Sequence, residues 1–183
     1  TQAFGGVRVP FRHGAVLANG AVILRPDGSV DAEWKALVDG GLAAALPLMQ
    51  SLLSGGRDRA AHAGLDLRSW LVMEDGVATY AVFKDNVDAS GSGLADLAAM
   101  MPAPSGWTLH RNGNNLAYIP PCISKRLACE RLIAAARAAD PARVALGFGD
   151  SLSDLGFMSL CDVIATPGAG QVADALAWLA PHR

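Results

Sequence analysis

The sequence is poor in charge and in cysteine. Charged residues make up 17% of its 183 positions and the formal net charge is −2, so nothing in the charge balance suggests nucleic acid as a partner. The three cysteines, Cys122, Cys129 and Cys161, are an odd number and lack the spacing of a zinc site. A disulfide framework is therefore not expected, and a cytoplasmic location fits best.

Long apolar runs are lacking too. Stretches such as 41–49 and 172–180 are too short to span a bilayer. No basic segment precedes an apolar run at the start of the chain, so the sequence predicts neither a membrane partner nor a signal peptide. Hydrophobic residues nonetheless make up 51% of the chain, which is enough for one good core or two small ones.

Turn and cap residues divide the first two thirds of the chain into short elements. Asn19-Gly20 favours positive φ and predicts a tight turn between two apolar runs. Asp31 predicts the N-cap of a helix over 32–53, which Gly40-Gly41 and Pro47 would interrupt or kink. Turn signals then bound strands at 65–73 and 77–84, a helix at 92–101, and strands at 107–111 and 115–119.

From residue 120 onward, helices and strands alternate. The expected elements are a helix at 124–139, a buried strand at 144–148, a helix from 153, a strand at 162–165 and a helix at 170–179. This alternation is typical of an α/β fold with a parallel sheet. We predict a Rossmann-like α/β core from residues 1–31 and 120–183, with an inserted α+β cap at 32–119 that acts as a lid.

Two carboxylates follow the predicted strand at 144–148. Ligands of open α/β sheets bind beyond the carboxyl ends of the strands. Asp150 lies at that end, and Asp154 lies at the start of the next helix. Two carboxylates directed at one point repel each other unless a cation joins them, and hard oxygen ligands suit Mg²⁺. The alternative is that either aspartate only caps the helix.

Lys125 lies in the first turn of the helix that begins after Ser124. The helix dipole disfavours a cation at that position, whereas both the lysine and the helix amides would attract a bound phosphate. Alone, Lys125 would be interpreted as a solvated surface lysine. Followed by a helix, a strand and the two aspartates, it favours a phosphate site.

At these residues the chain resembles a known family. Ile123-Ser124-Lys125 and Gly149-Asp150-Ser151-Leu152-Ser153-Asp154 resemble motifs III and IV of the haloacid dehalogenase (HAD) superfamily. The Asn19-Gly20-Ala21 turn and the hairpin-rich insertion resemble its Cof-type and sucrose-phosphate-phosphatase-like branch, which carries a C2-type cap. The resemblance implies a Mg²⁺-dependent phosphatase that hydrolyses a small, sugar-phosphate-like monoester through an aspartyl-phosphate intermediate.

The resemblance also implies roles for single residues. Asp150 and Asp154 would be metal ligands, and Lys125 and Asp154 would be catalytic. Asn19 and Lys125, with Arg111 and Asn112 of the cap, would bind the small phosphorylated substrate. For Arg111 and Asn112, each taken alone, the sequence favours the alternative of a polar turn residue that faces water, and for Asn19 it favours an ordinary turn residue. His13 and His110 could act as acid–base groups, but no partner for them is evident in the sequence, which favours structural histidines.

The family's nucleophile motif, DxDxT/V, does not occur in the chain. We therefore expect the first part of the core, on the order of one βαβ unit, to lie before Thr1 and to hold the nucleophile. An alternative is a non-catalytic HAD-like module that binds phosphorylated ligands or partners. A third is a plain α/β domain whose aspartates only cap a helix. We expect a monomer or a homodimer.

Overall fold

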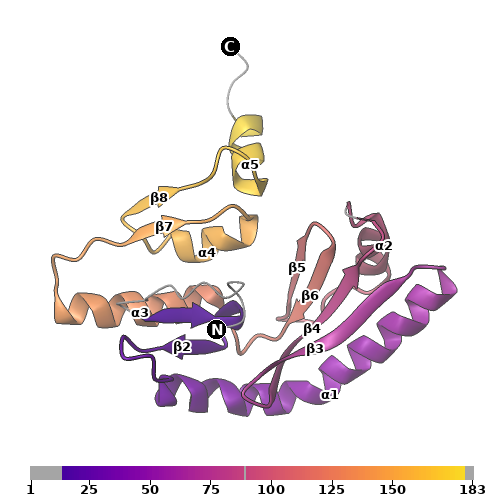
Figure 1. The fold of residues 1–183 in the computed structure, drawn as a ribbon, viewed down its shortest axis with the longest axis horizontal. Helices are drawn as coiled ribbons and strands as arrows, with labels where there is room; N and C mark the ends of the chain where they lie inside the picture. Colours follow the sequence, from indigo (N-terminus) through magenta and orange to yellow (C-terminus); the bar gives the residue numbers. More distant parts are fainter. Residues whose placement is uncertain (1–13, 89, 180–183) are drawn as a thin grey trace.

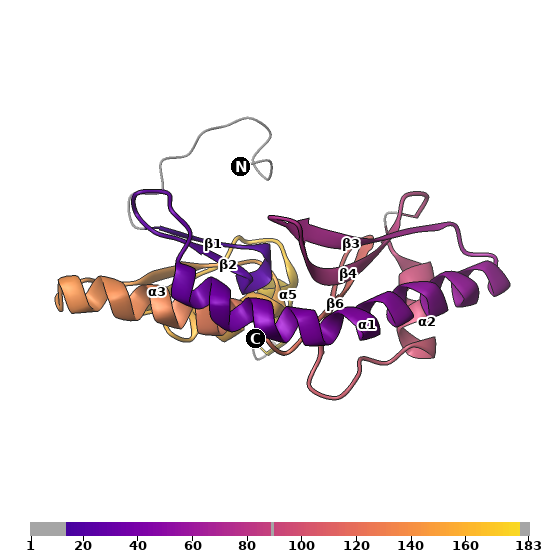
Figure 2. The ribbon, with the colours of Figure 1, turned by 90° about the horizontal axis from the view of Figure 1, so that it is seen from below.

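The computed structural model describes residues 14–88 and 90–179, which form a mixed α/β fold (Figures 1 and 2). The strands are β1 (Ala15–Leu17), β2 (Val22–Leu24), β3 (Leu67–Glu74), β4 (Val77–Asp85), β5 (Thr108–Asn112), β6 (Asn115–Ile119), β7 (Leu146–Phe148) and β8 (Val163–Ala165). The helices are α1 (Ala32–His62), α2 (Ser92–Met100), α3 (Lys125–Ala139), α4 (Leu155–Met158) and α5 (Gln171–Leu179). Two 3₁₀ turns, η2 (Ala18–Gly20) and η3 (Leu152–Asp154), complete the described chain.

The strands form three separate sheets. β1 and β2 pair as an antiparallel hairpin, and β3, β4, β6 and β5 form an antiparallel sheet in that order. The two predicted hairpin turns are confirmed, and Asp75 and Gly76 adopt the positive φ values of 48° and 79° that a tight turn needs. Parallel pairing is present in β7 and β8, and among the described residues it is limited to that pair.

Helix α1 is longer than predicted and unbroken from Ala32 to His62. Asp31 caps it as expected, because its carboxylate accepts a hydrogen bond from the Trp34 amide at 3.1 Å. The predicted interruption at Gly40-Gly41 and Pro47 is wrong, because the helix continues through all three residues. Gly41, and further along Gly56, instead make room for neighbouring side chains. A Cβ atom would lie 2.4 Å from Cys122 Cβ at Gly41 and 2.3 Å from the Phe83 ring at Gly56.

Two clusters of buried residues make up the core, and α1 contributes to both. Its first half packs with the β1–β2 hairpin and α3 through Trp34 and Val38. Its second half, together with α2, packs on the face of β4 and β6 that presents Phe83 and Tyr118. The first cluster also includes residues of β4 and β6, so it crosses the predicted boundary between core and cap. The division into those two parts stays a prediction.

Helix α1 is also long and apolar enough, by length and composition alone, to cross a membrane. The most apolar stretch of it is 28% buried inside the protein. The apolar run at 41–49 therefore lies within a helix that extends beyond it on both sides. A core helix can meet the same test of length and composition, and the absence of a membrane partner stays a prediction.

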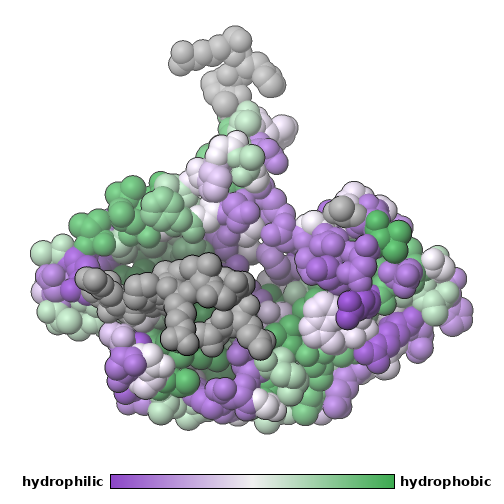
Figure 3. Space-filling view, in the orientation of Figure 1, coloured by the Kyte–Doolittle hydropathy of each residue, from purple (hydrophilic) through white to green (hydrophobic). Residues whose placement is uncertain are grey.

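The strand predicted to be buried at 144–148 is shorter and more open than expected. In β7 only Gly147 is buried, while Leu146 and Phe148 are 59% and 69% exposed. β8 lies along it with Ile164 57% exposed. Figure 3 shows the resulting apolar surface over β7 and β8 at the upper left. Parallel strands are normally covered on both faces, so the described part of the chain leaves this pair incompletely covered.

Candidate functional site

Lys125 and Asp154, 29 residues apart, form an ion pair. The Lys125 ammonium donates a hydrogen bond to Asp154 Oδ1 at 2.8 Å. Lys125 is the first residue of α3, where Ser124 caps the helix by accepting a hydrogen bond from the Leu127 amide at 3.4 Å. An ammonium has three donors, so the pair with Asp154 leaves two of them for a ligand.

Besides its ion pair with Lys125, Asp154 stabilises the turn after β7. Its second oxygen, Oδ2, accepts hydrogen bonds from the Ser151 hydroxyl at 2.8 Å and the Ser151 amide at 3.2 Å. Burial raises the pKa of this carboxyl, but the hydrogen bonds from Lys125 and Ser151 outweigh burial, and its pKa is lowered. The capping alternative and the pairing with Lys125 therefore both apply to Asp154.

Gly149 allows Asp154 to lie close to the end of β7. Its φ is not positive, so it is not needed for a left-handed turn. A Cβ there would instead lie 2.6 Å from Asp154 Cβ and 2.7 Å from Met158 Sδ. A larger residue would push the Asp154 turn away from β7.

The Asn19-Gly20 turn packs directly on the start of α3. Asn19 and Gly20 have φ values of 58° and 103°, which confirms the predicted turn. A Cβ on Gly20 would lie 2.3 Å from the Ser124 carbonyl oxygen and 2.8 Å from the Lys125 backbone nitrogen. The Trp34 indole donates a hydrogen bond to the Gly20 carbonyl at 2.9 Å and fixes the turn. The turn thus places Asn19 beside Lys125.

A cavity of about 160 Å³ opens where these segments meet. It is lined by Asn19, Thr108, His110, Ile119, Ser124, Lys125, Arg126, Ser153 and Gly156. We call it the Lys125 cavity. Two of these residues are cationic and none is acidic, so the lining favours an anion. Asn19 and Lys125, both predicted from the sequence to bind the ligand, lie together in it.

Asp150 faces a second cavity of about 510 Å³ at the carboxyl ends of β7 and β8, beside Thr166 and Pro167. This is the place where ligands bind in open α/β sheets. Its carboxylate is exposed and has no hydrogen-bond partner in the described chain. Its backbone carbonyl accepts a hydrogen bond from the Val172 amide at 3.0 Å, which ties the strand end to α5.

The described residues do not by themselves suit Mg²⁺. Magnesium requires near-octahedral oxygen coordination, yet both oxygens of Asp154 are engaged by Lys125 and Ser151. No group of three His, Cys, Asp or Glu residues that could hold a metal is found in residues 14–88 and 90–179. Of the two aspartates, Asp150 is the one whose carboxylate makes no hydrogen bond in the described chain. The assignment of Asp150 and Asp154 as metal ligands stays a prediction.

Two of the predicted ligand contacts lie outside the Lys125 cavity. Arg111 and Asn112 are exposed at the end of β5 and do not line it. The Arg111 carbonyl instead accepts a hydrogen bond from the Gln171 side chain at 3.4 Å, which links β5 to α5. His13, considered above as an acid–base group, lies outside the described residues.

The sequence did not identify His110 or Thr108 as ligand contacts, although both line the Lys125 cavity. They are two residues apart on β5 and so share one face of that strand. The alternation of side chains along a strand shows which residues share a face. It does not show that this face of β5 meets the Lys125 cavity, because the opposite wall of the cavity, the start of α3, begins 15 residues beyond His110.

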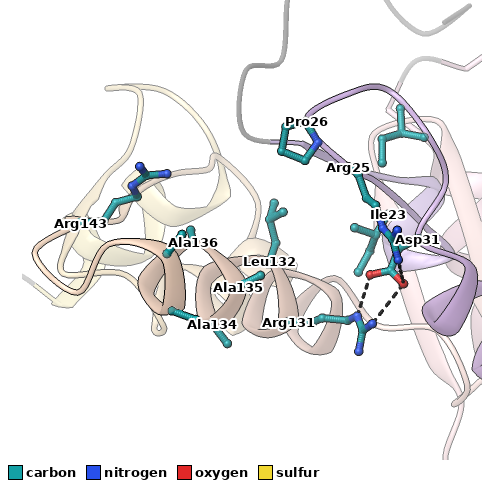
Figure 4. Close-up of a pocket in the computed structure, with 13 residues that line it drawn as sticks. Ile23, Arg25, Pro26, Asp31, Arg131, Leu132, Ala134, Ala135, Ala136 and Arg143 are labelled. Atoms are coloured by element: carbon teal, nitrogen blue, oxygen red, sulfur yellow. Dashed lines mark hydrogen bonds and ion pairs between the residues drawn. The ribbon is translucent and has the colours of Figure 1, made fainter.

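A larger cavity of about 680 Å³ lies between β2 and α3 (Figure 4). Its walls are largely apolar, with alanines of α3 along one side. Arg131 there binds Asp31 through two hydrogen bonds of 2.9 and 3.1 Å and Glu33 through one of 2.8 Å. Unlike the Lys125 cavity, the larger cavity has an acidic lining residue, Asp31, which pairs with Arg131 and Arg25.

Comparisons with known proteins give distant likenesses. No protein-family model and no curated protein match this sequence. One similar structure is trehalose-6-phosphate phosphatase from Aspergillus fumigatus, with a TM-score of 0.42, 14% identity and coverage of 85% of this chain and 60% of that one. Another is TM0651 from Thermotoga maritima, with a TM-score of 0.36, 13% identity and coverage of 90% and 74%. The chain thus spans about 60% of the length of the first protein. Likeness this distant does not determine the chemistry of this chain.

Proposed function

We propose that the Lys125 cavity binds the phosphate of a small phosphomonoester and that the chain supplies this part of a HAD-type phosphatase. The observation that carries the proposal is the Lys125 ammonium, held 2.8 Å from Asp154 at the start of α3, in a cavity without acidic lining residues. The resemblance of Ile123–Lys125 and Gly149–Asp154 to the family's motifs supports the same assignment.

The start of α3 adds backbone donors to the lysine. The Leu127 amide bonds to the Ser124 hydroxyl and the Ala128 amide to the Ser124 carbonyl. The amides of Lys125 and Arg126 remain without an acceptor in the described chain. Helix N-termini attract phosphate through such amides and the helix dipole. Arg126 adds a second positive charge, although its guanidinium also donates to Gly156 and Ser159.

In phosphoryl transfer, such a site would position the phosphate and offset its charge, which are the main tasks of the protein in this chemistry. Asp154 would keep the ammonium directed at the cavity. Hydrolysis would also need a nucleophile, and no D-x-D motif occurs in these 183 residues. In this proposal the nucleophile is therefore supplied from outside this chain, and magnesium dependence is part of the same proposal.

A second candidate is a module that binds phosphorylated ligands without turnover. It is favoured by the absence of a three-residue metal-binding group from the described part of the chain. The two candidates predict the same phosphate binding at Lys125. They differ in whether any product is released.

The first test compares two lysine variants. Lys125→Ala should weaken binding of inorganic phosphate at least tenfold, measured by isothermal titration calorimetry, because a charged hydrogen bond contributes about 1.5–3 kcal/mol. Lys35→Ala is the matched control. Lys35 also pairs with an aspartate, Asp39, at 2.8 Å, but on the surface of α1. Equal effects of the two variants, or none at Lys125, would contradict the phosphate site.

The second test separates enzyme from binding module. A panel of sugar phosphates is incubated with the native protein, including whatever segment supplies the nucleophile, in Mg²⁺ and in chelator, and released phosphate is measured. Release that is lost in chelator and in Lys125→Ala supports the phosphatase. Phosphate binding without release supports the module, and release that survives chelation contradicts the magnesium-dependent mechanism.

A further inference from the structure

We propose that His110 of β5 selects the ligand of the Lys125 cavity by hydrogen bonding to the non-phosphate part of a short phosphorylated, hydroxylated molecule. This inference rests on the proposed binding of phosphate at Lys125. His110 would act as a specificity-determining residue, next to but separate from the groups that hold the phosphate.

The β5–β6 hairpin places His110 at the cavity. His110 pairs with Ala117 and Thr108 pairs with Ile119 in antiparallel register. Thr108, His110 and Ile119 all line the cavity that Lys125 lines from α3. One wall is thus a strand of the four-stranded sheet and the other is the start of a helix. A ligand phosphate held at Lys125 would have the rest of its molecule beside His110.

The His110 imidazole is available to a ligand. It is partly buried, and within residues 14–88 and 90–179 it makes no hydrogen bond. A neutral imidazole carries one donor and one acceptor, which matches a ligand hydroxyl.

The charges around His110 favour its neutral form. Burial lowers the pKa of His110 and the Lys125 charge lowers it further, while the Asp154 charge offsets this in part. Burial and the Lys125 charge thus favour the neutral imidazole, which can both donate and accept. Phosphate charge would be balanced by Lys125 and Arg126, and His110 would bind a neutral group.

The size of the cavity limits the ligand. Its volume of about 160 Å³ is well below the roughly 300–1,000 Å³ typical of pockets for drug-sized molecules. It suits a phosphate with a short hydroxylated chain, such as glycerol 3-phosphate, better than a phosphorylated disaccharide. Thr108, on the same face of β5, offers a second hydroxyl contact.

The test measures the binding of inorganic phosphate and of glycerol 3-phosphate to the full chain by calorimetry. His110→Ala should weaken glycerol 3-phosphate binding roughly tenfold, as expected for the loss of one hydrogen bond to a buried group. It should leave inorganic phosphate binding unchanged. His110→Gln, which keeps a donor and an acceptor, should recover most of the loss.

His62→Ala is the matched control, because His62 is exposed at the end of α1 and should change neither affinity. Equal losses for both ligands in His110→Ala, or no loss for glycerol 3-phosphate, would overturn the role of His110. A phosphorylated disaccharide that binds as tightly as glycerol 3-phosphate would overturn the size limit. If the wild-type chain binds neither inorganic phosphate nor glycerol 3-phosphate, the proposed function fails as well. Inorganic phosphate binding that depends on Lys125, together with glycerol 3-phosphate binding that does not depend on His110, overturns only this inference.

Discussion

At the scale of single residues, Asp31 shows how a carboxylate can join two helices. It caps α1 through the Trp34 amide and receives two hydrogen bonds from Arg131 of α3. The hydrogen bonds from Arg131 lower its pKa most, burial opposes them, and the pKa falls from 3.8 to about 2. Asp31 thereby links the first turn of α1 to the helix that carries Lys125.

This shift predicts a pH-dependent stability. Because the folded pKa lies below the unfolded value, the contribution of Asp31 is complete above about pH 4 and is lost as the pH falls towards 2. Asp31→Asn keeps a capping oxygen but removes the charge pair with Arg131. We expect it to lower the free energy of unfolding by about 1 kcal/mol at pH 7, since the pair is only partly shielded from water, and by much less at pH 2.

Urea denaturation at the two pH values measures the effect. Asp39→Asn, which removes the exposed pair with Lys35 on α1, is the control and should change the stability by less. A loss in Asp31→Asn that is the same at pH 2 and pH 7 would show that the Arg131 pair does not stabilise the fold.

At the scale of elements, the sequence predicted cap and turn residues correctly, but it did not predict the effect of the glycines within α1. The capping residue Asp31 and the Asp75-Gly76 turn act through neighbours a few residues away, so the sequence alone predicted them. Gly40-Gly41 was interpreted as a break because glycine lowers helix propensity. The need for space beside Cys122 and Phe83 comes from residues far along the chain, which no local pattern reveals.

Two glycines of α1 should therefore respond in opposite ways to the same substitution. Gly40 has open space around its Cβ position, so Gly40→Ala should stabilise the protein by roughly 0.5–1 kcal/mol through helix propensity. At Gly56 a Cβ would meet the Phe83 ring at 2.3 Å, so Gly56→Ala should destabilise it by about 1–3 kcal/mol. Thermal denaturation measures both changes.

The two variants control for each other, because both remove a glycine from the same helix. A rise in melting temperature for Gly56→Ala would mean that α1 does not approach β4 as closely as the structure shows. A fall for Gly40→Ala would mean that α1 is less regular around that residue.

At the scale of the whole molecule, the sequence predicted the α/β class and the meeting of Lys125 with the Gly149–Asp154 turn. The strand-to-helix order implied that contact because both segments lie at one edge of the fold. The sequence did not predict that the β5 strand faces the same cavity, or that Arg111 and Asn112 lie outside it. Those features depend on how the four-stranded sheet packs against the start of α3, which is set by contacts between distant segments.

The central claim is that the Lys125 cavity, and not another part of the molecule, is the phosphate site. Titration of the ¹⁵N-labelled chain with inorganic phosphate, followed by amide chemical shifts, tests it most directly. We predict that the largest shifts occur at Lys125, Arg126 and the Asn19 turn. If these residues show no shifts, or if the largest shifts occur around Arg131 in the larger cavity between β2 and α3, the claim is contradicted.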